Sequence, residues 1–175
     1  MKIVAFAGST SSRSINKTLV EFALTYFDKD QVELLDLNDF EMPIFSVDKE
    51  KKGFPEAAHL FLQKMREADI IICSLAEHNR SYSAAFKNIF DWASRIELKV
   101  FSDKPMLLMS TSPGGYGGGN VMNTAKQFFP QFGADIRATF SLIKYNDNFE
   151  KGKGITNPEL LEAFEEVITN FKETL

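Results

Sequence analysis

Short apolar runs alternate with longer amphipathic stretches from one end of this chain to the other. Five short runs have the length and composition of buried strands: residues 2–7, 31–36, 69–75, 105–110 and 134–142. Five longer stretches place apolar residues three and four positions apart, as helices do: residues 15–27, 54–68, 84–96, 120–132 and 158–171. This alternation predicts an α/β fold, with a parallel sheet, helices on both faces and right-handed crossovers. No repeat or linker divides the chain, so we expect residues 1–175 to form a single domain.

Particular residues support these assignments. Residues 69–75 form an unbroken apolar run, which is typical of a central parallel strand that helices cover on both faces. Pro55 suits the first turn of the helix predicted over 54–68, and Asn157 suits the N-cap of the last helix. Two long connections, 37–53 and 143–156, separate these elements. The first carries an apolar Met-Pro-Ile-Phe segment at 42–45, which we expect either to lie on the surface or to contact a ligand or a second subunit.

Composition narrows the class of protein. The 175 residues include 20 basic and 24 acidic side chains, and this net charge of -4 argues against a nucleic-acid-binding protein. One cysteine and two histidines argue against a disulfide or a metal site. No run approaches the ~18 to 20 apolar residues that span a bilayer, so we expect no membrane segment and a cytoplasmic location. The 17 phenylalanines favour an oligomer interface or a ligand site with aromatic walls.

Three unusual loops follow the first, third and fourth predicted strands. The carboxyl ends of parallel strands form the ligand-binding edge of an open α/β sheet, so these loops should meet. The first loop, residues 8–16, offers four serine hydroxyls, one threonine hydroxyl, an arginine and the N–H groups of a helix start. Such groups bind phosphate, although one hydroxyl alone would suffice as a helix cap. The loop has neither the Walker pattern nor the dinucleotide glycine fingerprint.

The second loop, residues 76–83, places His78 between Glu77 and Asn79. That arrangement suits acid–base catalysis, but no serine or cysteine nucleophile accompanies it, and the donors better fit the edge of a planar heterocycle. The third loop, residues 112–119, holds five glycines, so its backbone either approaches a ligand closely or adopts positive φ. Its exposed N–H groups suit negative charge on a bound ring. A phosphate at one end and a flat hydrogen-bonding ring at the other give the outline of FMN.

These motifs, in this order, resemble the NADPH-dependent FMN reductase family, which includes flavodoxin-like azoreductases, quinone reductases and chromate reductases. The resemblance covers residues 1 to about 135 and rests on these matching positions: Gly8, Ser9, Ser14, Asn16, Glu77, Asn79, Lys87, Asn88, Asp91, Trp92, Ser112, Gly114, Gly115, Gly117 and Gly118. The chain departs from the family at three places. Ser11 replaces an arginine and Arg13 follows two residues later, while Ala76 and His78 replace a proline and a tyrosine.

The resemblance implies a flavodoxin-like three-layer sandwich with five parallel strands in the order 2-1-3-4-5. It implies an NAD(P)H-dependent FMN oxidoreductase, in which hydride passes from NADPH or NADH to bound FMN and then to a small-molecule acceptor: a quinone, azo compound, flavin or metal oxyanion. It assigns the phosphate to Ser9, Ser11, Arg13, Ser14, Ile15 and Asn16. It assigns the ring to Ala76, Glu77, His78, Asn79 and Arg80 on one side and to Ser112, Gly114 and Gly115 on the other. No protein acid or base is required.

Similar proteins are homodimers or homotetramers, which gives two candidate interfaces. One is residues 42–45, and the other is the apolar face of the helix at 84–96: Phe86, Ile89, Phe90, Trp92, Ala93 and Ile96. That face equally suits core packing against the sheet. Two other functions compete with the enzyme. A flavodoxin-type electron carrier would bind FMN without accepting hydride, but its usual Thr-rich phosphate loop and strongly acidic surface are absent. A phospho-receiver would need acidic residues after the first strand, where Gly8, Ser9 and Thr10 stand.

Overall fold

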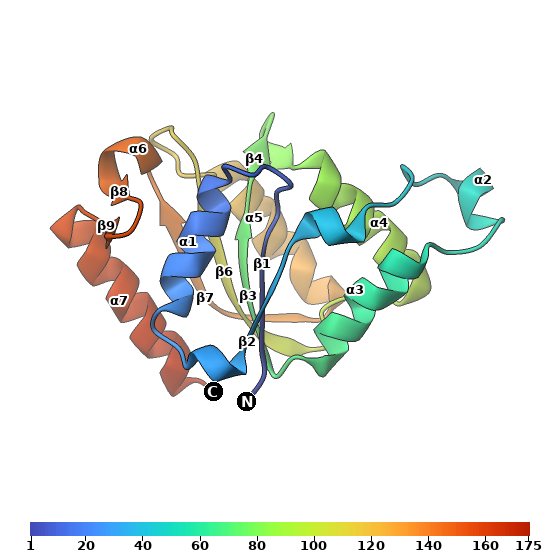
Figure 1. Cartoon of the computed structure of the whole chain (residues 1–175), viewed down its shortest axis with the longest axis horizontal. Helices are drawn as coiled ribbons and strands as arrows, with labels where there is room; N and C mark the ends of the chain where they lie inside the picture. Colours follow the sequence, from blue (N-terminus) through green and yellow to red (C-terminus); the bar gives the residue numbers. More distant parts are fainter.

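Five parallel strands form one sheet at the centre of the computed structural model, which describes residues 1–175 (Figure 1). The strands, in spatial order, are β2 (Val32–Leu35), β1 (Ile3–Ala7), β3 (Ile70–Leu75), β6 (Lys104–Thr111) and β7 (Ala134–Leu142). Counted along the sheet strands alone, this is the order 2-1-3-4-5, so the predicted flavodoxin-like topology is confirmed. The order reverses between β1 and β3, which is where ligands bind in such folds.

Helices cover both faces of the sheet, because successive strand residues point to opposite sides. Ile3 and Ala5 pack in one core cluster with residues of α1 (Ile15–Leu24) and α7 (Pro158–Glu173). Val4 and Phe6 pack in a second cluster with α3 (Glu56–Glu67), α4 (Ala84–Ile96) and α5 (Gly119–Phe128). The strands β1 and β3 are buried along their whole length, as the unbroken apolar runs predict. No helix has both the length and the apolar character that crossing a membrane requires.

Element boundaries differ from the prediction at four helices. The α3 helix spans Glu56–Glu67 rather than 54–68, and Pro55 lies at its N-cap with extended backbone instead of in its first turn. The α1 helix ends at Leu24 rather than residue 27, where the Thr25 hydroxyl donates to the Phe22 carbonyl. The helix predicted over 120–132 divides into α5 and a 3-10 turn, η3 (Phe129–Phe132), because Pro130 lacks the N–H that a continuing helix needs. The last helix runs two residues beyond the prediction, to Glu173.

The connections between the main helices and strands contain small elements that the hydrophobic pattern does not predict. A 3-10 turn, η1 (Lys29–Gln31), precedes β2, and η2 (Leu37–Phe40) and α2 (Val47–Glu50) follow it. The second loop forms a hairpin of β4 (Glu77–His78) and β5 (Ser81–Tyr82). After β7 come α6 (Tyr145–Asn148) and a second hairpin, β8 (Phe149–Glu150) with β9 (Gly154–Ile155). Figure 1 shows α2 far from the sheet, and α6 with this second hairpin beside α1, where Phe149 and Gly154 contact Phe22.

The phenylalanines mainly fill the core. Seven of them are fully buried: Phe6, Phe61, Phe86, Phe101, Phe129, Phe164 and Phe171. The predicted interface on α4 is wrong for most of its side chains, since all of them but Ile96 are buried and the alternative of core packing holds. The segment 42–45 differs, because Ile44 is 78% exposed at the start of the connection that carries α2.

Candidate functional site

The first, second and third loops meet at the carboxyl ends of β1, β3 and β6, as predicted. Asn16, in the first turn of α1, is only 3% exposed and joins α1 to the ends of β3 and β6. Its Oδ1 accepts the Ser74 hydroxyl at 2.7 Å and the Thr111 N–H at 3.0 Å, and its Nδ2 donates to the Thr111 carbonyl at 3.2 Å. Both acceptor positions of this side chain, which was predicted to bind phosphate, and one of its two N–H donors hold the ends of β3 and β6 against α1.

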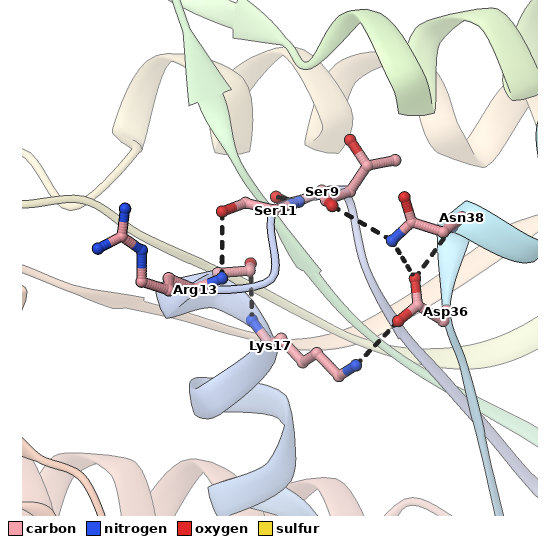
Figure 2. Close-up of polar contacts among 8 residues, drawn as sticks. Ser9, Ser11, Arg13, Lys17, Asp36 and Asn38 are labelled. Carbon is pink, nitrogen blue, oxygen red and sulfur yellow. Dashed lines mark hydrogen bonds and ion pairs between the residues drawn. The ribbon is translucent and has the colours of Figure 1, made fainter.

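Serine hydroxyls shape the first loop from within (Figure 2). Ser9 Oγ accepts the Ser11 N–H and Ser11 Oγ accepts the Arg13 N–H, each at 3.2 Å. Ser14 Oγ accepts the Lys17 N–H at 3.1 Å and so caps α1. A hydroxyl that accepts one of these bonds keeps its own hydrogen for a ligand. Three of the predicted phosphate-binding residues thus hold the loop in shape and retain a donor each.

Backbone donors of the first loop have no partner in the chain. The N–H groups of Thr10, Ser12, Ile15 and Asn16 make no hydrogen bond with any other residue. Those of Ile15 and Asn16 belong to the free first turn of α1, where the helix dipole also favours an anion. Four free N–H groups and three free hydroxyl hydrogens around a helix start suit a phosphate group. The structure therefore fits the phosphate predicted for this loop.

The two cations of this region have different surroundings. Lys17 pairs with Asp36 at 3.0 Å, and the pKa of Asp36 lies below its ordinary value because it accepts the Asn38 N–H and the Lys17 ammonium. Asn38 also donates to the Thr10 carbonyl at 3.2 Å, which fixes the outer side of the first loop. Arg13 is exposed, has no ion pair in the chain and points away from Asp36 and Asn38 (Figure 2). Arg13 is thus the free cation of the first loop.

The second loop is a tight hairpin turn that Glu77 attaches to α5. Asn79 and Arg80 form the turn with φ of 50° and 63°, the left-handed values that two-residue hairpin turns require. The two carboxylate oxygens of Glu77 accept the Asn120 side-chain amide at 3.0 Å and the Val121 N–H at 2.9 Å. Glu77 therefore connects the second loop to the helix that follows the third loop. His78 and Arg80 are exposed at the same edge, while Ala76 is buried.

Four of the five glycines of the third loop divide into two kinds, while a Cβ on the fifth, Gly119, would lie 2.6 Å from the Tyr116 ring. Gly117 and Gly118 have φ of 59° and 79°, and a Cβ on either would lie 3.0 Å from the backbone of Leu142 or the Cβ of Ser110. Gly114 and Gly115 have no positive φ, and a Cβ on either would meet nothing closer than 3.7 Å. The fold itself thus requires Gly117 and Gly118 but not the other two. Gly114 and Gly115 also have N–H groups without a partner in the chain, so they are the glycines that suit close approach of a ligand.

Residues of α4 that carry the resemblance hold the segment 42–45. Asn88 Oδ1 accepts the Phe45 N–H at 2.8 Å, while its Nδ2 donates to the carbonyls of Met42 and Pro43. Trp92 Nε1 donates to the Pro43 carbonyl at 2.7 Å. These side chains are structural, and they place Met42 next to the first loop and α4.

Some residues of this site were not predicted from the sequence. Ser74, Thr111 and Asn120 complete the hydrogen bonds of Asn16 and Glu77, and Asn38 fixes the first loop. Polar residues at the ends of apolar strands were the available signal for Ser74 and Thr111. The ligand-binding roles of the fourteen predicted site residues stay predictions.

Comparisons with known proteins agree with this fold and site. The family model for NADPH-dependent FMN reductase matches residues 1–147. An NADPH:quinone oxidoreductase of Arabidopsis thaliana is 36% identical over 132 residues, which cover 73% of this chain and 65% of that protein. An NAD(P)H-dependent FMN reductase of Pseudomonas aeruginosa is 31% identical over 118 residues, which cover 67% of this chain and 63% of that protein. The matches thus span a little under two thirds of the length of these relatives.

A solved structure shares the fold over nearly the whole chain. The flavoenzyme NAD(P)H:(acceptor) oxidoreductase FerB of Paracoccus denitrificans superposes with a TM-score of 0.78 at 22% identity, covering 99% of this chain and 96% of that one. Fold and site together define a flavodoxin-like protein with a loop of unpartnered backbone donors at its switch point. The chain belongs to the NADPH-dependent FMN reductase family, whose members are oxidoreductases that use FMN and NAD(P)H.

Proposed function

We propose that this chain is an NAD(P)H-dependent FMN oxidoreductase that reduces a small acceptor such as a quinone. The observation that carries the proposal is the set of free donors at the three loops. Four backbone N–H groups of the first loop, and those of Gly114 and Gly115, have no partner in the chain. These donors lie at the edge of the sheet where a parallel α/β fold binds its ligands.

The first loop would hold the FMN phosphate with its N–H groups, its serine hydroxyls and the Arg13 guanidinium. The second and third loops would hold the ring between them. Bound FMN supplies the hydride-accepting chemistry, which no side chain of the protein can supply. The residues of the chain orient the ring, and the N–H groups of Gly114 and Gly115 stabilise negative charge near them. Both oxygens of Glu77 already accept hydrogen bonds, so this carboxylate acts as an anchor and not as a base.

A pocket beside the first loop supports a small acceptor. It has a volume of about 290 Å³, and apolar Leu37, Phe40 and Met42 line it together with the amides of Asn38 and Asn88. Its size lies near the lower end of the range of small-molecule sites, roughly 300 Å³ and upward. A flat molecule with an apolar body fits the wall of Leu37, Phe40 and Met42, and the name of the Arabidopsis relative points to quinones.

The segment 42–45 and α2 favour a homodimer or homotetramer. Ile44 is 78% exposed and Val47 is 58% exposed, and neither is needed by the core of this chain. Exposed apolar side chains on a projecting segment are typical of surfaces that bind another protein. Sedimentation of the wild type beside an Ile44→Asp, Val47→Asp variant tests this part. We expect a smaller species for the variant, and an unchanged mass would place any interface elsewhere.

The test of the phosphate site compares FMN with riboflavin, which has the same ring and no phosphate. Charge-assisted hydrogen bonds contribute about 1.5–3 kcal/mol each, so two of them alone predict at least about 100-fold tighter binding of FMN. Quenching of flavin fluorescence measures both dissociation constants. Equal affinities would remove the first loop from the site. NADPH oxidation followed with a benzoquinone as acceptor then tests the activity, and no oxidation above the acceptor-free rate would contradict the quinone reductase assignment.

A further inference from the structure

We propose that Glu41 makes the acceptor pocket select against anionic acceptors, so that neutral quinones are reduced in preference to sulfonated dyes and metal oxyanions. The acceptor pocket is the pocket of about 290 Å³ that the first loop, the connection after β2 and α4 enclose. This inference rests on the proposed function, because it takes that pocket as the place where the acceptor binds. It adds which charge the pocket admits and which residue decides it.

One charged side chain lines the acceptor pocket, and it is a carboxylate. The nine lining residues comprise five apolar side chains, the amides of Asn38 and Asn88, the hydroxyl of Thr10 and the carboxylate of Glu41. Glu41 is exposed and forms neither an ion pair nor a side-chain hydrogen bond within the chain, and Asp39, two residues before it, is likewise unpaired. A carboxylate without a partner beside apolar walls repels an anion in the pocket.

The amides of the acceptor pocket do not offset this carboxylate, because the N–H groups that could bind an anion are already used. Asn88 Nδ2 donates to the carbonyls of residues 42–43 at 3.2 Å each. Asn38 Nδ2 donates to the Thr10 carbonyl at 3.2 Å and to Asp36 Oδ1 at 2.7 Å (Figure 2). The free oxygen of the Asn38 amide is itself an acceptor, so the Thr10 hydroxyl is the one side-chain donor left for a ligand.

The cations of the surrounding elements do not reach the acceptor pocket. Three of them pair with carboxylates at 2.5–3.0 Å: Lys17, Lys87 and Arg95. The lysines of residues 49–52 lie on or directly after α2, which projects away from the sheet (Figure 1). Arg13 of the first loop points away from Asn38, which lines the pocket (Figure 2). No cation therefore lines the pocket and cancels the charge of Glu41.

The position of Glu41 is set by its neighbours on both sides. Phe40 is 3% exposed and packs edge to face against Phe61, with the ring centres 5.5 Å apart. Met42 packs against the same core cluster, and Asn88 holds its carbonyl. The backbone at residue 41 therefore cannot withdraw from the pocket without disturbing the core. The carboxylate stays at the edge of the acceptor pocket, within the reach of its own side chain.

These surroundings divide the possible acceptors by charge. A neutral quinone can lie against the apolar wall without charge repulsion. A sulfonated azo dye or a metal oxyanion brings a negative charge that Glu41 repels, and the free donors of the first loop are assigned to the FMN phosphate, which is itself an anion. Two like charges about 4 Å apart weaken binding roughly fivefold even at the dielectric constant of water, and by more beside apolar walls.

The experiment compares 1,4-naphthoquinone with its 2-sulfonate as acceptors for the FMN-loaded whole chain and NADPH. The variants are Glu41→Gln and, as a control of equal charge, Glu166→Gln at an exposed, unpaired position of α7 on the other face of the sheet. The ratio of kcat/KM for the neutral quinone to that for the sulfonate removes the intrinsic reactivity of each acceptor from the comparison of proteins. We expect Glu41→Gln to lower this ratio at least about threefold and Glu166→Gln to keep the wild-type ratio. The same ratio in all three proteins would overturn the inference.

Two further measurements separate charge repulsion from a change of shape, and this inference from the proposed function. Added salt screens charges, so it should lower the ratio of the wild type and leave that of Glu41→Gln nearly constant, and a wild-type ratio that ignores salt would also overturn the inference. Calorimetric binding of 2-naphthol and naphthalene-2-sulfonate, which are not reduced, gives the same comparison without turnover. Reduction of neither quinone, with the expected difference in binding, would contradict the proposed function and support the role of Glu41. Reduction of both quinones with a ratio that Glu41→Gln does not change would contradict the role of Glu41 and leave the proposed function standing.

Discussion

Replacing Asn16 by alanine tests whether one buried amide holds the three loops together. The side chain is 3% exposed and makes three hydrogen bonds, one to the Ser74 hydroxyl and two to the backbone of Thr111. Alanine removes all three and leaves the Ser74 hydroxyl and the Thr111 N–H buried without partners. Each unsatisfied buried group costs about 1–3 kcal/mol, so Asn16→Ala should lower the free energy of unfolding by about 2–6 kcal/mol.

The size of this loss matters because a domain is stable by only about 5–15 kcal/mol in total. Chemical denaturation followed by circular dichroism measures it. A second variant, Ser74→Ala, removes only one bond and leaves Asn16 Oδ1 bound to the Thr111 N–H, so it should cost about 0.5–1.5 kcal/mol. Asn170→Ala, at an exposed position of α7, is the matched control and should change stability by less than about 0.5 kcal/mol.

The expected order of stability is therefore wild type and Asn170→Ala, then Ser74→Ala, then Asn16→Ala. A loss below about 1 kcal/mol for Asn16→Ala would refute the reasoning, since it is less than a single unsatisfied group costs. A Ser74→Ala variant as unstable as Asn16→Ala would also refute it, because the Thr111 bonds would then contribute nothing. FMN affinity should fall in parallel with stability, as the loops lose their common support.

Three further variants test other parts of the site and fold. Gly118→Ala should lower stability by about 1 kcal/mol or more, because its φ of 79° is left-handed and its Cβ would crowd Ser110, whereas Gly114→Ala should keep stability and weaken FMN binding; equal unfolding midpoints for the two would contradict this division. The pKa of Glu33 lies below its ordinary value of 4.5 because it accepts hydrogen bonds from Lys64 and Lys2. The stability that these Glu33 ion pairs contribute is fully present above pH 4.5 and is lost as the pH falls through the lowered pKa of Glu33. The free energy of unfolding of Glu33→Gln should therefore depend less on pH in acid than that of the wild type. Identical acid-unfolding curves for the two proteins would contradict this prediction.

The centre of the sheet was predictable from the sequence because β1 and β3 are buried along their whole length. Residues 70–75 are apolar without interruption but for Ser74, and such runs bounded by polar turns have few alternatives to a central strand. The helix at 84–96 was predicted to the residue, since Ser83 caps it and its apolar face is regular. The end of α1 was not predicted correctly. Tyr26 and Phe27 continue the apolar spacing beyond Leu24, but they pack in the core cluster that contains α7 residues without being helical.

Short hairpins escaped prediction for a different reason. Strands of two residues have no measurable period, and the turn at Asn79 and Arg80 lacks the glycine that normally identifies a two-residue turn. The β8–β9 hairpin lies in a polar connection whose packing depends on Phe22 and Gly154, far apart in the sequence. Its position against α1 could be learned only from the structure.

The residue types of the candidate site are readable in the sequence, whereas the contacts that these residues make within the fold are not. Asn16 follows a serine-rich loop and resembles a phosphate ligand, yet its partners lie 58 and 95 residues away in the sequence. Glu77 likewise binds groups 43 and 44 residues further on. Local patterns identify a donor-rich loop, whereas long-range hydrogen bonds decide which of its side chains are left for a ligand. The glycines of the third loop show the same limit, because their φ angles and the room for a Cβ, which separate Gly117 and Gly118 from Gly114 and Gly115, follow from the fold.

The most direct test of the central claim is the absorbance spectrum of the FMN-loaded protein before and after NADPH is added without oxygen. We expect bound-flavin bands that bleach on addition of NADPH and return when a quinone is added. Bands that persist with NADPH would contradict the reductase and favour an electron carrier. A protein that takes up no FMN at all would contradict the assignment of the three loops to the flavin.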